Sequence, residues 1–397
     1  MRAMLEQELP RDEIERNIQK FSRGIDLATA PETQLLFSHR LDPRIGTWGF
    51  TYDNMIGVDV RLLLGQTETA RRVLEFYRTK PGIQKLGGVV TGIHADRPEG
   101  SMAEAHVMNG PLAFQLIGEL HTYDATQDQR NFNAAIKQAE YLLSMQNTTK
   151  GAFNFGGFRM GPKGDPNNPY DQRLNFDPNA AQWYDLYNTE HNNDIRRAFK
   201  LLCDVLQYKD GDYRGLIQKL EYSIKINLEW RRKMYDPRKH LFYVGSTDVG
   251  YYSGYWDMTF KKGEPIPLHP LDATAWGVDD LGFIESLESD AVSKIREAID
   301  KNFLITIPFE RLDGKKVNIT LYGFMTHEER ARARNYKEIG PDGDELSFIG
   351  IGRPELGSFE WSSEVVINVD LYLATSYAKR GMMKEAEFYL RRYISGV

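Results

Sequence analysis

The feature that most constrains the fold of this sequence is a series of helical segments that come in pairs. Apolar residues recur at helical spacing over an opening segment and then over five pairs, each joined by a short turn. The opening segment covers residues 10–29, and the pairs cover 52–64 with 67–80, 102–122 with 127–146, 191–208 with 213–235, 271–284 with 289–302, and 359–379 with 382–394.

The two members of a pair differ in polarity. The first is apolar on most faces, as in Val365–Ile367, and the second carries a charged stripe, as in 382–394. The first is therefore expected to be buried and the second to face water. Such pairs build an open solenoid or a closed ring, and the irregular pair lengths favour the ring. The sequence predicts an all-α fold, an (α/α)6 toroid forming a single domain over residues 1–397, with a count slightly short of six complete pairs.

Connections between the pairs are long, whereas those within a pair are short. They cover residues 81–101, 147–190, 236–270 and 303–358, and each leads into the start of a first, inner helix. Long connections of this kind usually carry function, and these are expected to gather at one end of the toroid. The alternation within 234–257 predicts a small β-hairpin over that cavity end.

Composition and charge exclude several classes of partner. The 50 basic and 56 acidic residues are interspersed and give a net charge of -6, which argues against nucleic acid and anionic membranes. No apolar run reaches the length of a membrane span, and the N-terminus has no signal-peptide core. The sequence as read predicts a soluble cytoplasmic protein, or a secreted or periplasmic one if a signal peptide has been removed. It does not give the oligomeric state.

Known cofactor and metal motifs are missing from the sequence. It contains no GxGxxG, GxxxxGK[ST], HExxH, CxxC or GxSxG pattern. The single cysteine, Cys203, lies in an apolar helical run, so it is expected to be a buried apolar residue without a disulfide partner. We therefore expect neither a metal ion nor an organic cofactor.

Carboxylates gather where the inner helices begin. A carboxylate in a first turn is often only a cap, worth roughly 0.3–1 kcal/mol, but a cap does not need the Trp and Tyr residues that stand beside several of these positions. We therefore expect a cavity at these helix starts rather than a set of unrelated caps. The helix starts carry Asp53 behind Trp48 and Tyr52, Glu104, Glu190 with His191 and Asp194, Asp272 with Trp276, and Glu360 with Trp361.

Carboxylates beside aromatic rings are typical of sugar-binding sites, because rings stack on pyranose faces and carboxylates bind hydroxyl groups. Cleavage of a glycosidic bond needs a protonated carboxyl group and an ionised one. Asp53 and Glu360 are the leading catalytic pair and Glu190 is the third candidate. Because Trp361 would raise the pKa of Glu360, Glu360 is the expected acid and Asp53 the base or nucleophile. The sequence therefore predicts a glycoside hydrolase acting on an oligo- or polysaccharide.

Other polar and aromatic residues are candidates for substrate binding. His191 and Asp194 lie one helical turn apart, although His191 could equally be a structural histidine. Arg159 could bind an acidic sugar, against the simpler interpretation of a solvated loop arginine. The predicted substrate-binding residues are Trp48, Tyr52, His191, Asp194, Asp272, Trp276, Trp361 and Arg159.

Short blocks of the sequence resemble (α/α)6 toroid proteins related to glycoside hydrolases, the six-hairpin glycosidase-like group. The resemblance implies six hairpins with a cavity at the starts of the inner helices, and it does not identify one hydrolase family. The blocks are Tyr52-Asp53 with 69–76, Thr189–Asp194, Tyr235-Asp236-Pro237 with 242–245, Leu271–Gly277 and Phe359–Trp361.

Two other functions remain open on the same fold. A polysaccharide lyase or a sugar epimerase would use His191, Tyr52 and Arg159 in place of a carboxylate pair. A non-catalytic glycan-binding protein would keep the cavity without the chemistry. The three functions predict different effects of substitutions at these residues.

Overall fold

The structure, a computed structural model, describes most of the chain in two compact units. One unit comprises residues 2–230 and the other residues 231–397, and each is described here by itself. The prediction of one domain over the whole chain stays a prediction. The described residues are 11–40, 45–163, 183–252, 268–279, 281–310, 314–329, 338–339, 345–346, 357–358, 362–363 and 365–395.

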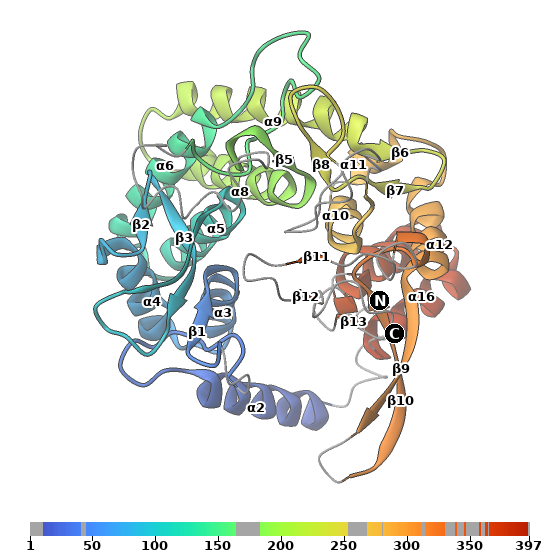
Figure 1. Ribbon diagram of the computed structural model, residues 1–397, viewed down its shortest axis with the longest axis horizontal. Helices are drawn as coiled ribbons and strands as arrows, with labels where there is room; N and C mark the ends of the chain where they lie inside the picture. Colours follow the sequence, from blue (N-terminus) through green and yellow to red (C-terminus); the bar gives the residue numbers. More distant parts are fainter. Residues whose placement is uncertain are drawn as a thin grey trace. The chain divides into compact units, whose positions relative to one another are not determined.

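The N-terminal unit is built from the predicted helix pairs. Inner helices α3, α5 and α8 form one layer and α4, α6 and α9 the other (Figure 1), with α5 packed against both α3 and α8. The predicted pairing in this part of the chain is confirmed. The helices are α2 (Arg11–Ala28), α3 (Thr51–Leu63), α4 (Thr67–Thr79), α5 (Asn109–Thr126), α6 (Gln129–Ser144), α8 (Thr189–Tyr208) and α9 (Arg214–Met234), with a short 3-10 turn η1 (Trp183–Asp185).

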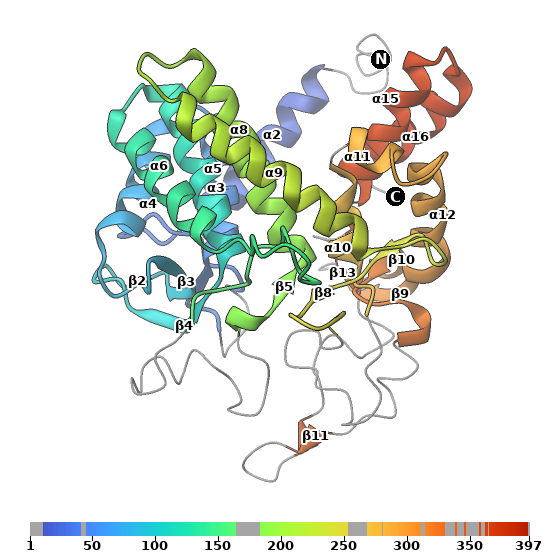
Figure 2. The same ribbon diagram turned by 90° about the horizontal axis from the view of Figure 1, so that it is seen from above.

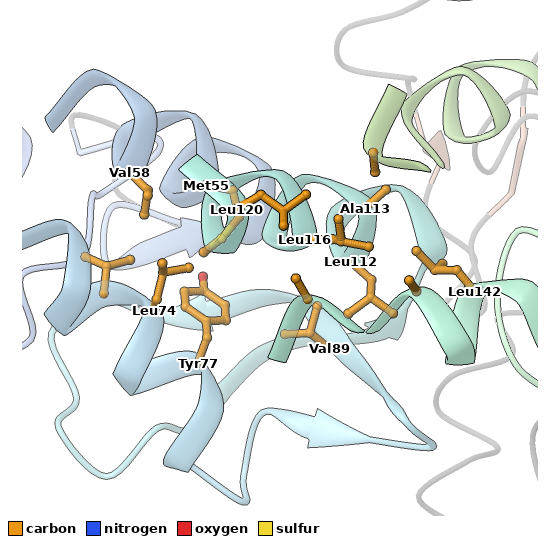
Figure 3. Close-up of a cluster of buried hydrophobic side chains, with 14 of the residues drawn as sticks. Met55, Val58, Leu74, Tyr77, Val89, Leu112, Ala113, Leu116, Leu120 and Leu142 are labelled. Atoms are coloured by element: carbon orange, nitrogen blue, oxygen red, sulfur yellow. The ribbon is translucent and has the colours of Figure 1, made fainter. Parts of the chain in front are cut away.

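Apolar side chains from α3, α4 and α5 form the core of this unit (Figure 3). Met55, Leu74, Leu112 and Leu116 are each at most 3% exposed. At Gly118 of α5, an added Cβ would lie 3.4 Å from the side chain of Val58, within van der Waals contact of α3. This packing fixes how the starts of the inner helices lie relative to one another.

The start of α5 differs from the prediction of one helix over 102–122. Residues Met102–Val107 form strand β4, which pairs with β3 (Gly88–His94), and α5 begins only at Asn109. The reason is Pro111 in the first turn of α5: proline clashes with a helical turn before it and biases the preceding residue away from helical backbone. The prediction that Glu104 lies at a helix start is therefore wrong: Glu104 lies on strand β4.

A small sheet surrounds this strand. β3 pairs with β1 (Trp48–Phe50), with β2 (Gln84–Lys85) and with β4, always antiparallel. In Figure 2, β2, β3 and β4 lie together at one end of the helices of this unit. The sheet is formed by the long connection 81–101 that the sequence analysis treated as a loop, together with the residues that flank it.

The C-terminal unit is also mainly helical, and the predicted inner helix 271–284 is broken into three pieces. Gly277 lies in the middle piece, a 3-10 turn, and a Cβ added there would approach the ring of Phe242 to 3.1 Å. The helices are α10 (Leu271–Ala275), the 3-10 turn η2 (Trp276–Asp279), α11 (Leu281–Glu285), α12 (Ala291–Phe303), the π-helical turn η3 (Val365–Asp370), α15 (Leu371–Lys379) and α16 (Met383–Ser395).

Strands of the C-terminal unit confirm one prediction and correct another. The predicted hairpin at 234–257 is present as β6 (Tyr235–Asp236) paired with β7 (Leu241–Phe242), followed by β8 (Gly245–Ser246), whereas residues 253–257 lie outside the described residues. Within the predicted loop 303–358, β9 (Leu304–Glu310) and β10 (Lys316–Gly323) form a regular antiparallel hairpin. The remaining strands of this unit are β11 (Glu338–Ile339), β12 (Glu345–Leu346) and β13 (Gly357–Ser358), whereas β5 (Tyr187–Asn188) belongs to the N-terminal unit.

Two further expectations concern single features of the chain. Cys203 of α8 is buried and unbonded, as the sequence predicted. Among the helices within the described ranges, none combines the length and the apolar character that a membrane crossing requires.

Candidate active site at the starts of the inner helices

Three side chains from two inner helices meet beside the first turn of α5. Tyr52 comes from α3, and His191 and Asp194 come from α8. The hydroxyl group of Tyr52 donates a hydrogen bond of 2.7 Å to Oδ2 of Asp194, and the Tyr52 and His191 rings lie 6.3 Å apart between centroids. We call these three residues, with Gly110 of α5, the Tyr52 cluster.

Gly110 provides the space in which the cluster assembles. A Cβ added there would lie 1.9 Å from the hydroxyl oxygen of Tyr52 and 2.5 Å from Cδ2 of His191. Both distances are shorter than any van der Waals contact, so no residue with a side chain fits this position without displacing the other two. The sequence analysis did not single out Gly110, because its role arises only when three helices are packed together.

Burial makes His191 a neutral group. Its side chain is 1% exposed, and this burial lowers its pKa to about 3, against a smaller opposing effect of the Met160 backbone. Among the described residues, Nδ1 of His191 has no hydrogen-bond partner. Asn188 caps α8 by accepting a 3.0 Å hydrogen bond from the His191 backbone N–H, which fixes the first turn that carries the ring.

Tyr52 is the member of the cluster that a ligand can reach. It is half-buried, with its ring edge against Phe114 at 5.0 Å, whereas Asp194 is completely buried. A phenol at the surface with a carboxylate behind it has the arrangement of an acid–base group and its hydrogen-bonding partner. Proton transfer is therefore the chemistry for which these positions are suited.

The segment 158–160 is hydrogen-bonded to the starts of α5 and α8. The backbone N–H of Asn109 donates to the carbonyl of Met160 at 2.8 Å, and its Nδ2 donates to the carbonyl of Arg159 at 2.7 Å. Asn192 accepts from the backbone N–H of Phe158 at 2.7 Å and donates to its carbonyl at 2.9 Å. Because these bonds join the segment to α5 and α8, Arg159 lies beside the first turn of α5.

Asp53, next to Tyr52 in sequence, has different neighbours. It is half-buried, and burial raises its pKa, against smaller lowering effects of a hydrogen bond from Ser38 and of the His39 charge. Successive residues of a helix point about 100° apart, which explains why Tyr52 and Asp53 contact different groups. Trp48 is also half-buried and contacts His94 ring edge to face at 6.5 Å, away from the contacts of Tyr52.

The remaining predicted site residues fall into three groups. Glu190 is half-buried in the first turn of α8. Asp272, 3% exposed, accepts from the Ala273 backbone N–H in the first turn of α10, and Trp276 is half-buried at the start of η2. Glu360 and Trp361 lie outside the described residues. The leading pair, Asp53 with Glu360, therefore stays a prediction, whereas Tyr52, His191 and Asp194 are brought together.

The C-terminal unit contains a histidine that the sequence analysis missed. His269, two residues before α10, lies between two carboxylates, with Nε2 3.3 Å from Asp236 and Nδ1 3.4 Å from Glu329. The ring of Tyr243 lies 4.6 Å from its ring. Although burial opposes it, hydrogen bonds from the Arg238 backbone and the Tyr243 hydroxyl lower the pKa of Asp236. The sequence signal was present: His269 stands directly before the proline that precedes an inner helix.

Within the part of the chain that the structure describes, no group of three or more His, Cys, Asp or Glu side chains is placed to hold a metal ion.

Comparison with known proteins gives matches only at the level of structure. No family model and no curated protein matches the chain. A D-mannose isomerase matches with a TM-score of 0.55 and 12% identity, over 97% of this chain and 84% of that one. A sugar epimerase from a ruminal bacterium gives 0.54 and 13%, over 94% and 83%. An inactive variant of an α-1,6-mannanase from Salegentibacter sp. gives 0.50 and 11%, over 96% and 85%.

These similarities decide the fold class. The fold is an (α/α)6 toroid. This confirms both the predicted architecture and the resemblance to six-hairpin proteins. The similar proteins act on carbohydrates by different reactions, since they include epimerases, an isomerase and a mannanase. Because one fold supports several chemistries, the reaction has to be argued from the site itself.

Proposed function

We propose that this protein is a carbohydrate-active enzyme that transfers a proton to or from a sugar carbon through Tyr52, as an epimerase or a lyase does. The observation that supports this most directly is the 2.7 Å hydrogen bond from the Tyr52 hydroxyl to the buried Asp194. Such a bond orients the phenol and gives its proton a nearby acceptor when Tyr52 takes a proton from the substrate. Tyr52 is then the catalytic acid–base group and Asp194 its positioning partner.

His191 has a role that fits its neutral state. His191 is 1% exposed and its ring lies 6.3 Å from that of Tyr52, so its proposed role is to position Tyr52 rather than to contact the sugar. The pKa of about 3 keeps His191 neutral throughout the physiological range. It is expected to hold the Tyr52 ring in place without adding a charge beside Asp194.

Glycoside hydrolysis is the second candidate, and a separate observation favours it. Burial raises the pKa of Asp53, and a raised pKa is what a general acid at a glycosidic oxygen requires. Its partner would be Glu360 or Glu190, as the sequence analysis proposed. In that case the Tyr52 cluster would bind the sugar rather than react with it.

The two functions are distinguished by where solvent deuterium appears in the product. The protein is incubated in D₂O with neutral and uronate-containing oligosaccharides, and the products are followed by NMR. Proton transfer to a sugar carbon forms a C–D bond in an epimerised product, whereas hydrolysis gives new reducing ends without C–D bonds. A lyase is recognised instead by the vinyl proton of its unsaturated product.

Substitutions then assign the reaction to its residues. Tyr52→Phe is expected to lower turnover by a factor of about 10² to 10⁴, the usual contribution of a general acid–base group. Asp53→Asn is expected to leave turnover unchanged. Tyr208→Phe is the matched control, because Tyr208 ends α8 and is 89% exposed. Loss of hydrolysis in Asp53→Asn with an active Tyr52→Phe would establish the second candidate, and sugar binding without turnover would establish a glycan-binding protein.

A further inference from the structure

Arg159 carries a positive charge that no carboxylate among the described residues neutralises. Its only polar side-chain contact among the described residues is a 2.7 Å hydrogen bond from Nη1 to the carbonyl of Tyr184, and no described carboxylate forms an ion pair with it. The guanidinium lies 3.8 Å from the ring centroid of Tyr184 and 5.3 Å from that of Tyr187. Most of its N–H donors are therefore oriented by the two rings but remain available.

Two arginines of the outer helix α4 show the compensation that a carboxylate gives. Arg78 binds Glu75 and Glu119 at 2.7 Å, and Arg71 binds Glu68 at 2.9 Å. Arg159 is half-buried, so its charge is partly removed from water without the compensation that these residues have. A half-buried, oriented guanidinium with free donors is the usual partner of a carboxylate or phosphate, which it binds through two parallel hydrogen bonds.

The position of Arg159 connects this charge to the Tyr52 cluster. Its carbonyl accepts from the side chain of Asn109, and the next residue along α5 is Gly110, over which Tyr52 and His191 meet. Consecutive Cα atoms are about 3.8 Å apart, and an arginine side chain extends farther than that. An anionic group held by Arg159 is therefore expected to belong to the same bound molecule as a sugar ring at Tyr52.

We propose that Arg159 binds the carboxylate of a uronic acid residue, and that the substrate of this protein is an acidic saccharide. The proposal rests on the proposed function and names its substrate class. A uronate carboxylate is attached to the carbon whose proton is removed in epimerisation or elimination, and neutralising the carboxylate makes that proton more acidic. A sugar phosphate would satisfy the guanidinium equally well but would not activate a neighbouring C–H bond.

The test measures binding separately from turnover. Calorimetric titrations use a tri-galacturonate, a matched neutral trisaccharide and glucose 6-phosphate, with wild-type protein, Arg159→Gln, Arg159→Lys and the control Arg97→Gln in the exposed turn between β3 and β4. Arg159→Gln is expected to weaken tri-galacturonate binding roughly ten- to a hundredfold, as for loss of a charge-assisted hydrogen bond, and to leave neutral-sugar binding unchanged. Arg159→Lys should recover part of the affinity, and Arg97→Gln should bind like the wild type.

Each outcome decides the proposal. Equal binding of tri-galacturonate by wild-type protein and Arg159→Gln would overturn it, and so would a preference for glucose 6-phosphate over the uronate. If Arg159→Gln unfolds at lower temperature than the wild type, Arg159→Lys carries the test, because it keeps the charge but not the paired donors. Arg159-dependent uronate binding without turnover would leave this proposal standing and refute the proposed function. Turnover of neutral sugars that needs Tyr52 but not Arg159 would support the proposed function and refute the proposal for Arg159.

Discussion

Buried polar side chains lie at both ends of helix α5, and they come from different helices at each end. In its second half, Glu119 accepts hydrogen bonds from Arg78 of α4 at 2.7 Å and from Asn131 of α6 at 2.8 Å. At its first turn, Gly110 lies under Tyr52 of α3 and His191 of α8. One end is thus bonded to outer helices, and the other is contacted by side chains of two inner helices.

This difference separates a structural cluster from a candidate catalytic one. Bonds between an inner and an outer helix join the two layers, and a fully buried carboxylate is stabilised there by a guanidinium and an amide. A junction of inner helices joins no layers. Instead it leaves a half-buried phenol hydrogen-bonded to a buried carboxylate, an arrangement suited to proton transfer.

The largest expected effect tests the catalytic end. Asp194→Asn keeps an acceptor for the Tyr52 hydroxyl but removes its base, so turnover should fall by about a hundredfold or more. Glu119→Gln is the matched change, at the other end of helix α5, and should leave turnover unchanged. Rates of product formation on the substrate identified by NMR decide the matter. If both substitutions lowered turnover equally, the distinction between the two ends would be lost.

The next effect sharpens the structural end through pH. Burial raises the pKa of Glu119 from its ordinary value of 4.5 to about 7, against the lowering effects of Arg78 and Asn131. The folded state therefore binds a proton that the unfolded state releases between these values. The associated stability is present in full below about pH 4.5 and is lost as the pH rises to about 7, amounting to roughly 3 kcal/mol.

Urea denaturation across this pH range measures that effect. The free energy of unfolding of the wild type should decline from pH 4.5 to pH 7, and the decline should be smaller in Glu119→Gln by the contribution of this one carboxyl group. Parallel profiles for the two proteins would show that Glu119 is ionised throughout, held by Arg78.

The smallest effect concerns the space at the first turn. Gly110→Ala should destabilise the protein by about 1–3 kcal/mol, because the new methyl group overlaps Tyr52 and His191, and should lower turnover as Tyr52 is displaced. Gly215→Ala in α9 is the control: nothing lies within 4 Å of its Cβ position, so the same change should be neutral or stabilising there. Thermal denaturation of both variants tests this, and an unaffected Gly110→Ala would show that the cluster has room to spare.

The sequence contained the helix pairs because helical periodicity is a local property. The alternation of an apolar helix with one that bears a charged stripe predicted inner and outer layers, and α3 with α4 and α5 with α6 confirm it. Local patterns were misleading where tertiary pairing intervened: residues Met102–Val107 became a strand through contact with β3, and the β9–β10 hairpin lay in a predicted loop. Propensity alone does not decide between helix and strand when another segment supplies the hydrogen bonds.

At the site, the sequence identified Tyr52, His191 and Asp194 as polar and aromatic residues at helix starts. Its leading hypothesis gave them the role of substrate binding and gave catalysis to a pair of carboxylates. Only the tertiary structure showed that Tyr52 donates to Asp194, a contact between residues 142 positions apart, and that Gly110 makes it possible. The physical reason is that a residue's type and local spacing determine what its side chain can do. Which other side chains it meets depends on how separate helices pack, and that is decided by the core of the whole unit.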